Sequence, residues 1–494
     1  MLKRGRACAM AFLLRETAVG GYPVGTILIE VPEECKGLAD GIREFVAKVV
    51  SGRKQGFAGG RSVDYGALEV GLGQAAAKVE SEGHRAILGS FDVDVPAVMI
   101  DGVRHSRAGR SMGTYYTLAG AVQVERTLYR TRGDKCVDAI GVRTGMVGNG
   151  WLPQTARAMA QQVARMPSRE AESSAQEVGR LVYSRSSFER VAHLVGEHYL
   201  ARHQDIEDVL IEEFEVPEEA RSVSISLDRV SVPMEEPKPK PRGRPRKDAP
   251  KRPVVRVFRM AYCGTVTLHD GDGKALHTIR YGSMAGEDPN ILCASLGADA
   301  AALLNQRPEL KVAAVCDGAP EMWNLLAPYV NETTLGTPVT RLVDFHHLIE
   351  KLGVAARVIH GSAASPVVDR WRLGLLNSST AADRILAELK ASGREHICVG
   401  TETPVHAAIT YFENHRGMFD YRSARAAGLP IGSGNVEATC KSLFEVRFKR
   451  CGARWKEESG EHIVHLRALV LSDRWPEAIT RTLQPLRKSV RVAA

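Results

Sequence analysis

Apolar and polar positions follow two different periods along the chain, and each period predicts its own kind of element. In residues 154 to 200 apolar residues recur at helical spacing, with short breaks near Pro167 and Ser184. This pattern predicts two or more helices with the outline of a helix-turn-helix. From residue 223 to 228 apolar and polar residues alternate strictly. That alternation predicts a β-strand whose apolar side chains face the core and whose last residue, Asp228, points away from it.

Strands and helices then follow one another through the carboxy-terminal half. The nearly all-apolar run before Asp317 predicts a strand buried on both faces, which is typical of a parallel, central strand. An acidic residue at the carboxyl end of such a strand points into the crevice where α/β proteins place their chemistry. The elements follow the order of the ribonuclease H-like α/β fold, which is three antiparallel strands, helix, strand, helix, strand and helix. The strands are expected at residues 223–228, 254–268, 276–281, 310–317 and 338–343, and the first helix at 290–306.

A third acid, Glu437, follows a glycine-broken loop that predicts the start of a long helix through residue 448. Glu437 would lie one turn inside this helix, where on its own it could simply complement the positive end of the helix dipole. The long interval between Asp317 and Glu437 exceeds what a bare core requires. We therefore expect a helical insertion at about residues 360 to 428, with helices over 366–389 and 404–412.

The carboxylates of Asp228, Asp317 and Glu437 are the candidate catalytic and metal-binding groups. Two-metal phosphoryl transfer needs carboxylates that converge from separate elements onto two ions, one activating water or a 3′-hydroxyl and the other stabilising the leaving oxygen. Without cations, repulsion between three such carboxylates would raise at least one pKa. Hard oxygen ligands favour Mg²⁺ or Mn²⁺ over zinc. The expected cofactors are therefore two Mg²⁺ or Mn²⁺ ions.

The charge balance suits a polyanionic partner, since 66 Lys and Arg stand against 58 Asp and Glu, giving a formal net charge of +8. Residues 235 to 253 are rich in proline and basic residues and lack an apolar period, which predicts an exposed loop. Within it Arg242, Gly243, Arg244 and Pro245 resemble an AT-hook, in which glycine lets an extended backbone lie in the minor groove of A·T-rich DNA. A solvated basic loop without a DNA contact is the alternative.

Two further segments are candidates for DNA contact. A recognition helix beginning near residue 186 would offer Ser187 and Arg190 to the major groove, with the apolar positions 188, 191 and 194 packing inward. An ordinary helical hairpin would give the same pattern. Basic residues on or just after the Glu437 helix would neutralise phosphates near the metal ions, unless they simply form a solvated face. These basic residues are Lys441, Arg447, Lys449, Arg450 and Arg454.

The amino-terminal part carries no recognisable chemistry up to about residue 110. Its pattern predicts a short strand at 26–31, a helix at 65–88 and a strand at 119–129 that forms half of a hairpin. The expected domains are an α+β module, a helix-turn-helix-like region, an α/β core containing the basic loop and the insertion, and a tail. They span residues 1–150, 151–218, 219–475 and 476–494.

Nine cysteines are scattered without a C-x-x-C pair, so neither a zinc ribbon nor a redox motif is expected, and a reducing cytoplasm fits best. The first 14 residues resemble a secretory signal in part, but Arg15 and Glu16 interrupt the apolar stretch, so export is not expected. No run approaches the length of about 18 apolar residues that a membrane span needs. We therefore expect a cytoplasmic, nucleoid-associated protein without a membrane partner.

Taken together, these motifs resemble those of bacterial insertion-sequence transposases of the Kra-four group, which are relatives of the Mutator-like transposases and use a DDE triad. The resemblance covers residues 222 to 475, about half of the chain. Its motifs are weak singly and specific together. They are SLD at 226–228, VCDGAP at 315–320, VDFHH at 343–347, LPIGSGNVE at 429–437, RFKR at 447–450 and RW at 454–455.

Carried over position by position, the resemblance makes Asp228, Asp317 and Glu437 the metal-binding triad and matches Asp344 and His347 to an accessory Asp-x-x-His motif. His347 would position the scissile phosphate or a flanking base, although a histidine held by a backbone hydrogen bond at a helix start is an alternative. Members of the group often carry cysteine pairs, like a zinc knuckle, ahead of the helix-turn-helix. Here that region retains only a histidine at 105 and a cysteine at 136, so no structural zinc is expected.

The resemblance implies a transposase that nicks the ends of an insertion sequence and joins the freed 3′-hydroxyl to target DNA. Transposon ends and target DNA would be its partners, and a homo-oligomer is expected in the synaptic complex. Two alternatives stay open. One is a domesticated, non-catalytic regulator that binds DNA without metal, and the other is a ribonuclease H-like nuclease, such as a junction resolvase, that cuts without joining.

Overall fold

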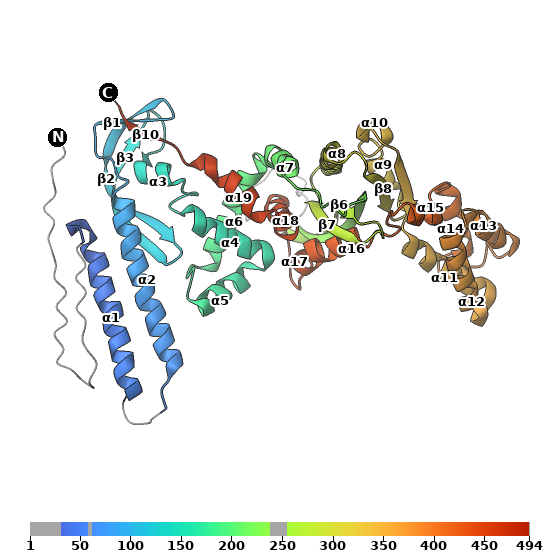
Figure 1. Cartoon of the computed structure of the whole chain (residues 1–494), viewed down its shortest axis with the longest axis horizontal. Helices are drawn as coiled ribbons and strands as arrows, with labels where there is room; N and C mark the ends of the chain where they lie inside the picture. Colours follow the sequence, from blue (N-terminus) through green and yellow to red (C-terminus); the bar gives the residue numbers. More distant parts are fainter. Residues whose placement is uncertain (1–30, 58–61, 238–253, 494) are drawn as a thin grey trace, which may run out of the picture. The chain divides into compact units, whose positions relative to one another are not determined.

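The computed structural model describes residues 31–57, 62–237 and 254–493 (Figure 1). The strand expected at 26–31 lies almost wholly outside the described residues, and Arg242, Gly243, Arg244 and Pro245 lie outside them altogether. The protein is a mixed α/β protein with two five-stranded sheets. It divides into two compact units, of which the first is Met1–Val195 with Arg481–Ala494 and the second is Gly196–Thr480. Each unit is described by itself.

The first unit contains a long helical hairpin and an antiparallel sheet. The helices are α1 (Lys36–Phe57) and α2 (Tyr65–Gly89), and α2 confirms the helix expected there. The predicted hairpin is also confirmed, because β2 and β3 pair along almost their whole length. The sheet has the order β10-β1-β2-β3-β4. Its strands are β1 (Ala97–Ile100), β2 (Val103–Thr117), β3 (Gly120–Arg130), β4 (Val137–Asp138) and β10 (Val490–Val492).

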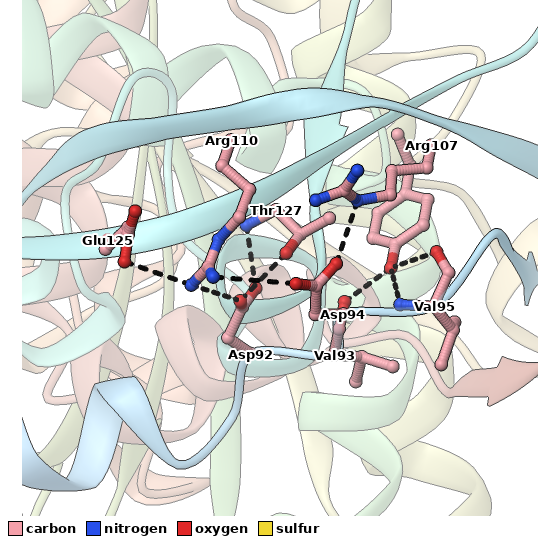
Figure 2. Close-up of polar contacts among 9 residues, drawn as sticks. Asp92, Val93, Asp94, Val95, Arg107, Arg110, Glu125 and Thr127 are labelled. Carbon is pink, nitrogen blue, oxygen red and sulfur yellow. Dashed lines mark hydrogen bonds and ion pairs between the residues drawn. The ribbon is translucent and has the colours of Figure 1, made fainter.

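Two acids in the segment between α2 and β1 bind this segment to the β-hairpin of β2 and β3 (Figure 2). Asp92 accepts hydrogen bonds from the backbone N and the Oγ1 of Thr127 on β3, at 2.9 and 3.0 Å. Asp94 pairs with Arg107 on β2 at 2.8 Å, and Arg110 lies 3.5 Å from Asp94. Thr127 is fully buried, so the Asp92 carboxylate meets a hydrogen-bonding need that water could not.

Four helices complete the described part of the first unit, and three of them span the region for which a helix-turn-helix is predicted. The helix starts expected near residues 168 and 185 are both confirmed. On α6, Phe188 and Val191 are fully buried and Leu194 is half-buried, as the recognition-helix pattern requires. The helices are α3 (Ala139–Thr144), α4 (Pro153–Arg165), α5 (Ser168–Val178) and α6 (Arg185–Leu200), the last ending in the second unit.

The second unit is built on a mixed sheet with the order β7-β6-β5-β8-β9. The first three strands are antiparallel, and β8 and β9 run parallel to β5, as predicted. One difference concerns the segment expected to be a loop from residue 235, because β5 continues through Pro237, where it pairs with Val254. The strands are β5 (Ser222–Pro237), β6 (Val254–His269), β7 (Ala275–Ser283), β8 (Lys311–Cys316) and β9 (Val339–Val343).

Strand β8 is parallel to its neighbours and buried on both faces, as its continuous apolar character predicts, but it lies next to the edge strand β9, and β5 is the central strand. Its residues 312, 314 and 316 belong to the hydrophobic core on the α8 side, whereas 313 and 315 belong to the core on the α11 side. Helices therefore cover both faces of the sheet. They are α7 (His203–Glu212), α8 (Pro289–Gln306), α9 (Pro320–Leu326), α10 (Glu332–Leu335) and α11 (Phe345–His360).

The expected helical insertion follows α11 and shares its hydrophobic core. The stretch expected to be helical at 366–389 forms two helices, because the chain turns at residues 378 to 380. The insertion contains α12 (Ala364–Asn377), α13 (Ala381–Ala391), α14 (Pro404–Asn414) and α15 (Tyr421–Ala426).

The long helix expected after the glycine-broken loop is present and has three parts. It begins as α16 (Gly434–Thr439), continues as the π-helix η3 (Cys440–Glu445) and ends as α17 (Val446–Phe448). A π-helical segment inside an α-helix frequently accompanies a functional site. The tail expected after residue 475 differs from the structure. After α18 (Glu457–Leu471) the chain forms α19 (Trp475–Leu483), and β10 then pairs with β1. None of the helices in the described residues combines the length and the apolar character needed to cross a membrane.

Candidate active site

Two neighbouring parallel strands, β8 and β9, each end directly before an aspartate, and a third aspartate lies within β5, just past the residues that pair with β8. Ile225 on β5 pairs with Ala314 on β8, and extending this register by three residues brings Asp228 level with Asp317. The last pair of β8 and β9 lies one residue before Asp317 and Asp344, and the Asp344 N–H donates to the carbonyl of the residue before Asp317 at 2.8 Å. Adjacent strands are about 5 Å apart, so the three acids share one edge.

A fourth acid reaches this edge from the helix that begins at Gly434. Glu437 Oε1 lies 3.3 Å from Ser433 Oγ, and Ser433 also donates to Asp344 Oδ2, through both its backbone N and its Oγ. His347, on the first turn of α11, completes the group, because its Nδ1 is 3.2 Å from Asp344 Oδ1 and 3.6 Å from Glu437 Oε1. The glycine-broken loop thus brings Glu437 to the strand ends.

These side chains surround one cavity of about 290 Å³. Asp228, Asp317, Glu437 and His347 all line it, so the structure brings together the three predicted metal ligands and the predicted accessory histidine. Asp344 does not line the cavity and is fully buried. The other lining residues are Leu227, Arg229, Val230, Ser231, Ser433, Val436, Cys440, Lys441, Glu445 and Lys449.

The environment shifts the charge states of these groups. Burial raises the pKa of Asp228 and the neighbouring Asp317 carboxylate raises it further, while hydrogen bonds from Arg229 N and Cys440 Sγ act against them. Burial alone would also raise the pKa of Asp344, but the hydrogen bonds from His347 and Ser433 hold it well below its usual range. The Asp344 contact and the nearby acids raise the pKa of His347 to about 9, so the imidazole is cationic at neutral pH.

The donor set fits a hard divalent cation. A buried carboxylate whose pKa is raised by a second carboxylate is a place where a bound cation would restore ionisation. Among the described residues, ligand atoms of Asp344, His347 and Glu437 lie within 4.8 Å of one another. The Asp344 oxygens are already engaged by His347 and Ser433, so Asp344 supports the site, and Asp228, Asp317 and Glu437 are the predicted ligands that line the cavity.

The basic residues predicted to contact DNA lie in different settings. Lys441 and Lys449 line the acidic cavity, and Lys449 also pairs with Glu445 at 3.0 Å. Arg447 corrects the prediction, because it is only 7 % exposed and its guanidinium lies over the Trp455 ring, 4.9 Å from the ring centre. Because its guanidinium packs against this aromatic ring, the Arg447 side chain is buried and is not available at the surface for a phosphate. Arg450 and Arg454 are exposed.

The two residues expected on the recognition helix belong to the first unit. Arg190 is exposed on α6, and Ser187 is half-buried with its Oγ 3.0 Å from Ser184 Oγ. The Ser184 backbone carbonyl also accepts a hydrogen bond from Ser187 N at 2.8 Å, which begins the helix. Ser187 is therefore engaged in the helix start, whereas Arg190 presents its side chain to solvent.

Sequence reasoning missed two groups in the site. Ser433 joins Asp344 to Glu437, and Cys440 Sγ lies 3.3 Å from Asp228 Oδ2. Ser433 lies in the motif at 429–437, but nothing in the motif indicates which distant carboxylate it contacts. Cys440 lies three residues after Glu437, the spacing at which helical side chains share a face, and this spacing was the available signal.

The comparisons with known proteins add no family. No protein-family model matches the sequence, and no curated protein matches it.

Proposed function

We propose that this protein is a DNA transposase whose second unit is a ribonuclease H-like core catalysing metal-dependent strand cleavage and strand transfer. The observation that carries the proposal is the convergence of Asp228 within β5, Asp317 directly after β8 and Glu437 on α16 on one cavity. The sheet order β7-β6-β5-β8-β9, with only the last two strands parallel to β5, supports the fold assignment.

In this proposal Asp228, Asp317 and Glu437 hold two Mg²⁺ or Mn²⁺ ions. Such ions, when bound, activate a water or a 3′-hydroxyl and stabilise the leaving oxygen. The chain supplies the rest of the site. The cationic His347 imidazole would hold a phosphate oxygen, and Lys441 and Lys449 would neutralise the approaching backbone. Asp344 and Ser433 keep Glu437 and His347 in place.

The proposed partners are transposon ends and target DNA, bound by more than one copy of the chain. Exposed Arg190 on α6 and the exposed arginines after the Glu437 helix support a DNA partner, because cations on a surface attract phosphates. A regulator without catalysis would need no cavity lined by Asp228, Asp317 and Glu437. A nuclease that cuts without joining would use the same cavity, so the products of the reaction have to separate these two activities.

A strand-transfer assay tests the proposal. The full-length chain is incubated with Mg²⁺, labelled DNA carrying the sequences that flank its gene, and a target plasmid. We expect nicks at the ends and joined products, and we expect Asp317→Asn to reduce both to background while weakening Mn²⁺ binding measured by calorimetry. Asp383→Asn, a matched change of an exposed aspartate on α13, should leave both unchanged.

The other outcomes are informative. Cleavage without joined products would assign the cavity to a nuclease. Metal-independent DNA binding without cleavage would assign the protein to regulation. Cleavage that survives Asp317→Asn would place the chemistry elsewhere and end the proposal.

A further inference from the structure

A second group of possible metal ligands lies between α18 and the loop that follows β7. It consists of Glu287 in that loop and of Glu461 and His465 on α18. Glu461 and His465 are four residues apart, so they project from the same face of the helix. One ligand atom of each residue lies within 4.8 Å of the others. None of the three lines the acidic cavity.

Glu461 is a buried carboxylate whose two oxygens have different surroundings. It is 5 % exposed, and its Oε2 accepts a hydrogen bond from Met284 N at 2.9 Å. Its Oε1 is inaccessible to solvent and accepts no hydrogen bond in the part of the chain that the structure describes. His465 Nε2 lies 2.6 Å from this oxygen, as an ion pair between residues four apart on α18. Two atoms that bind the same tetrahedral ion lie about 3.3 Å apart when each is about 2 Å from the metal, so a bound ion would take the place of the proton in this pair with a small shift of the side chains.

A cavity of about 80 Å³ opens beside the group and is lined by Glu287, His465 and His203. This volume is large enough for water, which needs only about 10–15 Å³ of space on this measure. His203 Nδ1 lies 2.9 Å from the Leu200 carbonyl, so the ring donates there and its Nε2 keeps a lone pair. A water molecule in the cavity, held by His203, can complete the coordination.

We propose that Glu287, Glu461 and His465 form a binding site for a divalent transition-metal ion, with Zn²⁺ as the best fit. Two carboxylates and one imidazole suit Zn²⁺, whereas Mg²⁺ prefers oxygen ligands and keeps several waters. Binding displaces protons from the imidazole and the carboxyl groups and needs no other reactant. The site is separate from Asp228, Asp317 and Glu437 and does not depend on the proposed DNA chemistry.

The metal would hold α18 in place, and α18 contacts the helix that carries Glu437. Arg467, on the same helix as Glu461 and His465, donates through Nε to the Ser442 carbonyl of η3 at 2.8 Å. Gly460 packs so closely against Met284 that a Cβ there would overlap the methionine side chain. An ion that joins α18 to the loop after β7 would therefore stabilise α18, the helix whose Arg467 contacts the π-helical segment.

The test uses the full-length, untagged chain, stripped of metal and dialysed into buffer with excess Mg²⁺, which keeps the acidic cavity supplied. Zn²⁺ is added and bound metal is measured by mass spectrometry, and Co²⁺ is added in parallel because its visible absorption reports nitrogen and oxygen ligands. We expect one Zn²⁺ per chain, a rise in Tm and a Co²⁺ spectrum typical of low coordination. Thermal unfolding in the presence of Mg²⁺ alone should lack this rise.

Matched variants locate the ion. Glu287→Gln, on the half-buried loop, should weaken Zn²⁺ binding at least tenfold, and Glu461→Gln should do the same if it folds. Glu458→Gln, an exposed acid on α18, and Asp317→Asn should keep the full stoichiometry. Zinc that is lost in Asp317→Asn, or kept at full affinity in Glu287→Gln, would overturn the proposal.

The competing explanation is that Glu287 and Glu461 lie together without a metal because they share a proton. Burial and the neighbouring Glu461 raise the pKa of Glu287 to about 7, which favours such a proton. In that case Zn²⁺ would neither bind at one per chain nor change Tm, and this result would also overturn the proposal.

Discussion

Asp344 is fully buried, yet it accepts hydrogen bonds from His347 N, Ser433 N and Ser433 Oγ. The donors come from the start of α11 and from the loop before Glu437, two segments far apart in the sequence. A buried carboxylate that is fully hydrogen-bonded remains ionised and holds its donors in one arrangement. The positions of His347 and Glu437 therefore depend on a residue that does not face the cavity.

Asp344→Asn should lower the free energy of unfolding by about 2–4 kcal/mol, because the amide loses charge-assisted hydrogen bonds and turns a donor toward the Ser433 group. Denaturation by urea measures this loss. Asp420→Asn is the matched control, since Asp420 caps α15 through one hydrogen bond to Ser423 N at 3.1 Å, and should cost about 1 kcal/mol or less. Equal losses in the two variants would contradict the role assigned to Asp344.

Asp299 is a buried acid whose charge state changes within an accessible pH range. It accepts a hydrogen bond from Tyr281 and lies 3.3 Å from the Arg474 guanidinium. Burial raises the pKa of Asp299 to about 6, and the Arg474 charge offsets part of this rise. The folded protein therefore binds this proton more tightly than the unfolded chain, whose aspartates titrate at about 3.9.

The stability contributed by Asp299 should accordingly fall as pH rises from about 4 to about 6, by up to about 3 kcal/mol. The measurement is the free energy of unfolding of the native chain minus that of Asp299→Asn, which cannot ionise, at several pH values. This difference should decrease across the window and then level off. Asp383→Asn, at an exposed aspartate, serves as the control for the substitution itself. A rising difference would mean that Arg474 dominates the titration of Asp299.

The helical insertion contacts the end of β8 through a tight approach between Gly318 and the Tyr411 ring of α14. A Cβ built on Gly318 would overlap that ring. Gly318 directly follows Asp317, so the contact bears on the position of a proposed metal ligand. The insertion therefore helps to shape the site, although Tyr411 does not line the cavity.

Gly318→Ala should destabilise the protein by about 1–3 kcal/mol through overpacking. The same substitution should cost close to nothing in a Tyr411→Ala background, where the ring is absent, and this coupling is measured as a double-mutant cycle in urea. Gly353→Ala on α11 is the control. Its Cβ would have no neighbour closer than 3.9 Å, so it should stabilise the helix by about 0.5–1 kcal/mol. Additive effects of the Gly318 and Tyr411 changes would rule out the contact.

The strands and their order were predictable because each strand is encoded by its own local pattern. The alternation before Asp228 and the apolar run before Asp317 both reflect burial, and burial depends on the layers that flank a sheet. The position of Asp317 was predictable for the same reason, since a residue at the carboxyl end of a parallel strand lies at the edge of the sheet where α/β proteins place their sites.

Contacts made over long distances in the sequence were not predictable. The link from Ser433 to Asp344 depends on how a loop folds back across the sheet. Arg447 is a basic residue in a basic segment, and only the position of the Trp455 ring shows that it is buried. In the π-helical segment Leu443 and Phe444 pack against Gly282, about 160 residues away in the sequence, and no local pattern indicates that contact.

The chain leaves the first unit after Val195, builds the whole second unit and returns to the first at Arg481. Its last strand, β10, then pairs with β1 at the edge of the antiparallel sheet. The first unit is thus completed only when the carboxy-terminal end has been made. The second unit contains the acidic cavity and has its own hydrophobic cores.

Deletion of residues 488 to 494 should weaken the first unit and leave the second intact. The deletion removes the three pairs between β10 and β1, each worth about 0.2–1 kcal/mol. Amide hydrogen exchange at Val98–Ile100 should therefore become faster, whereas exchange in β8 should not change. The full-length variant Lys488→Gln, which loses the 2.8 Å ion pair with Asp101 but keeps the strand, should exchange like the native chain at both places. Faster exchange in β8 after the deletion would show that the returning strand supports the second unit as well, and the two units would then be one folding unit.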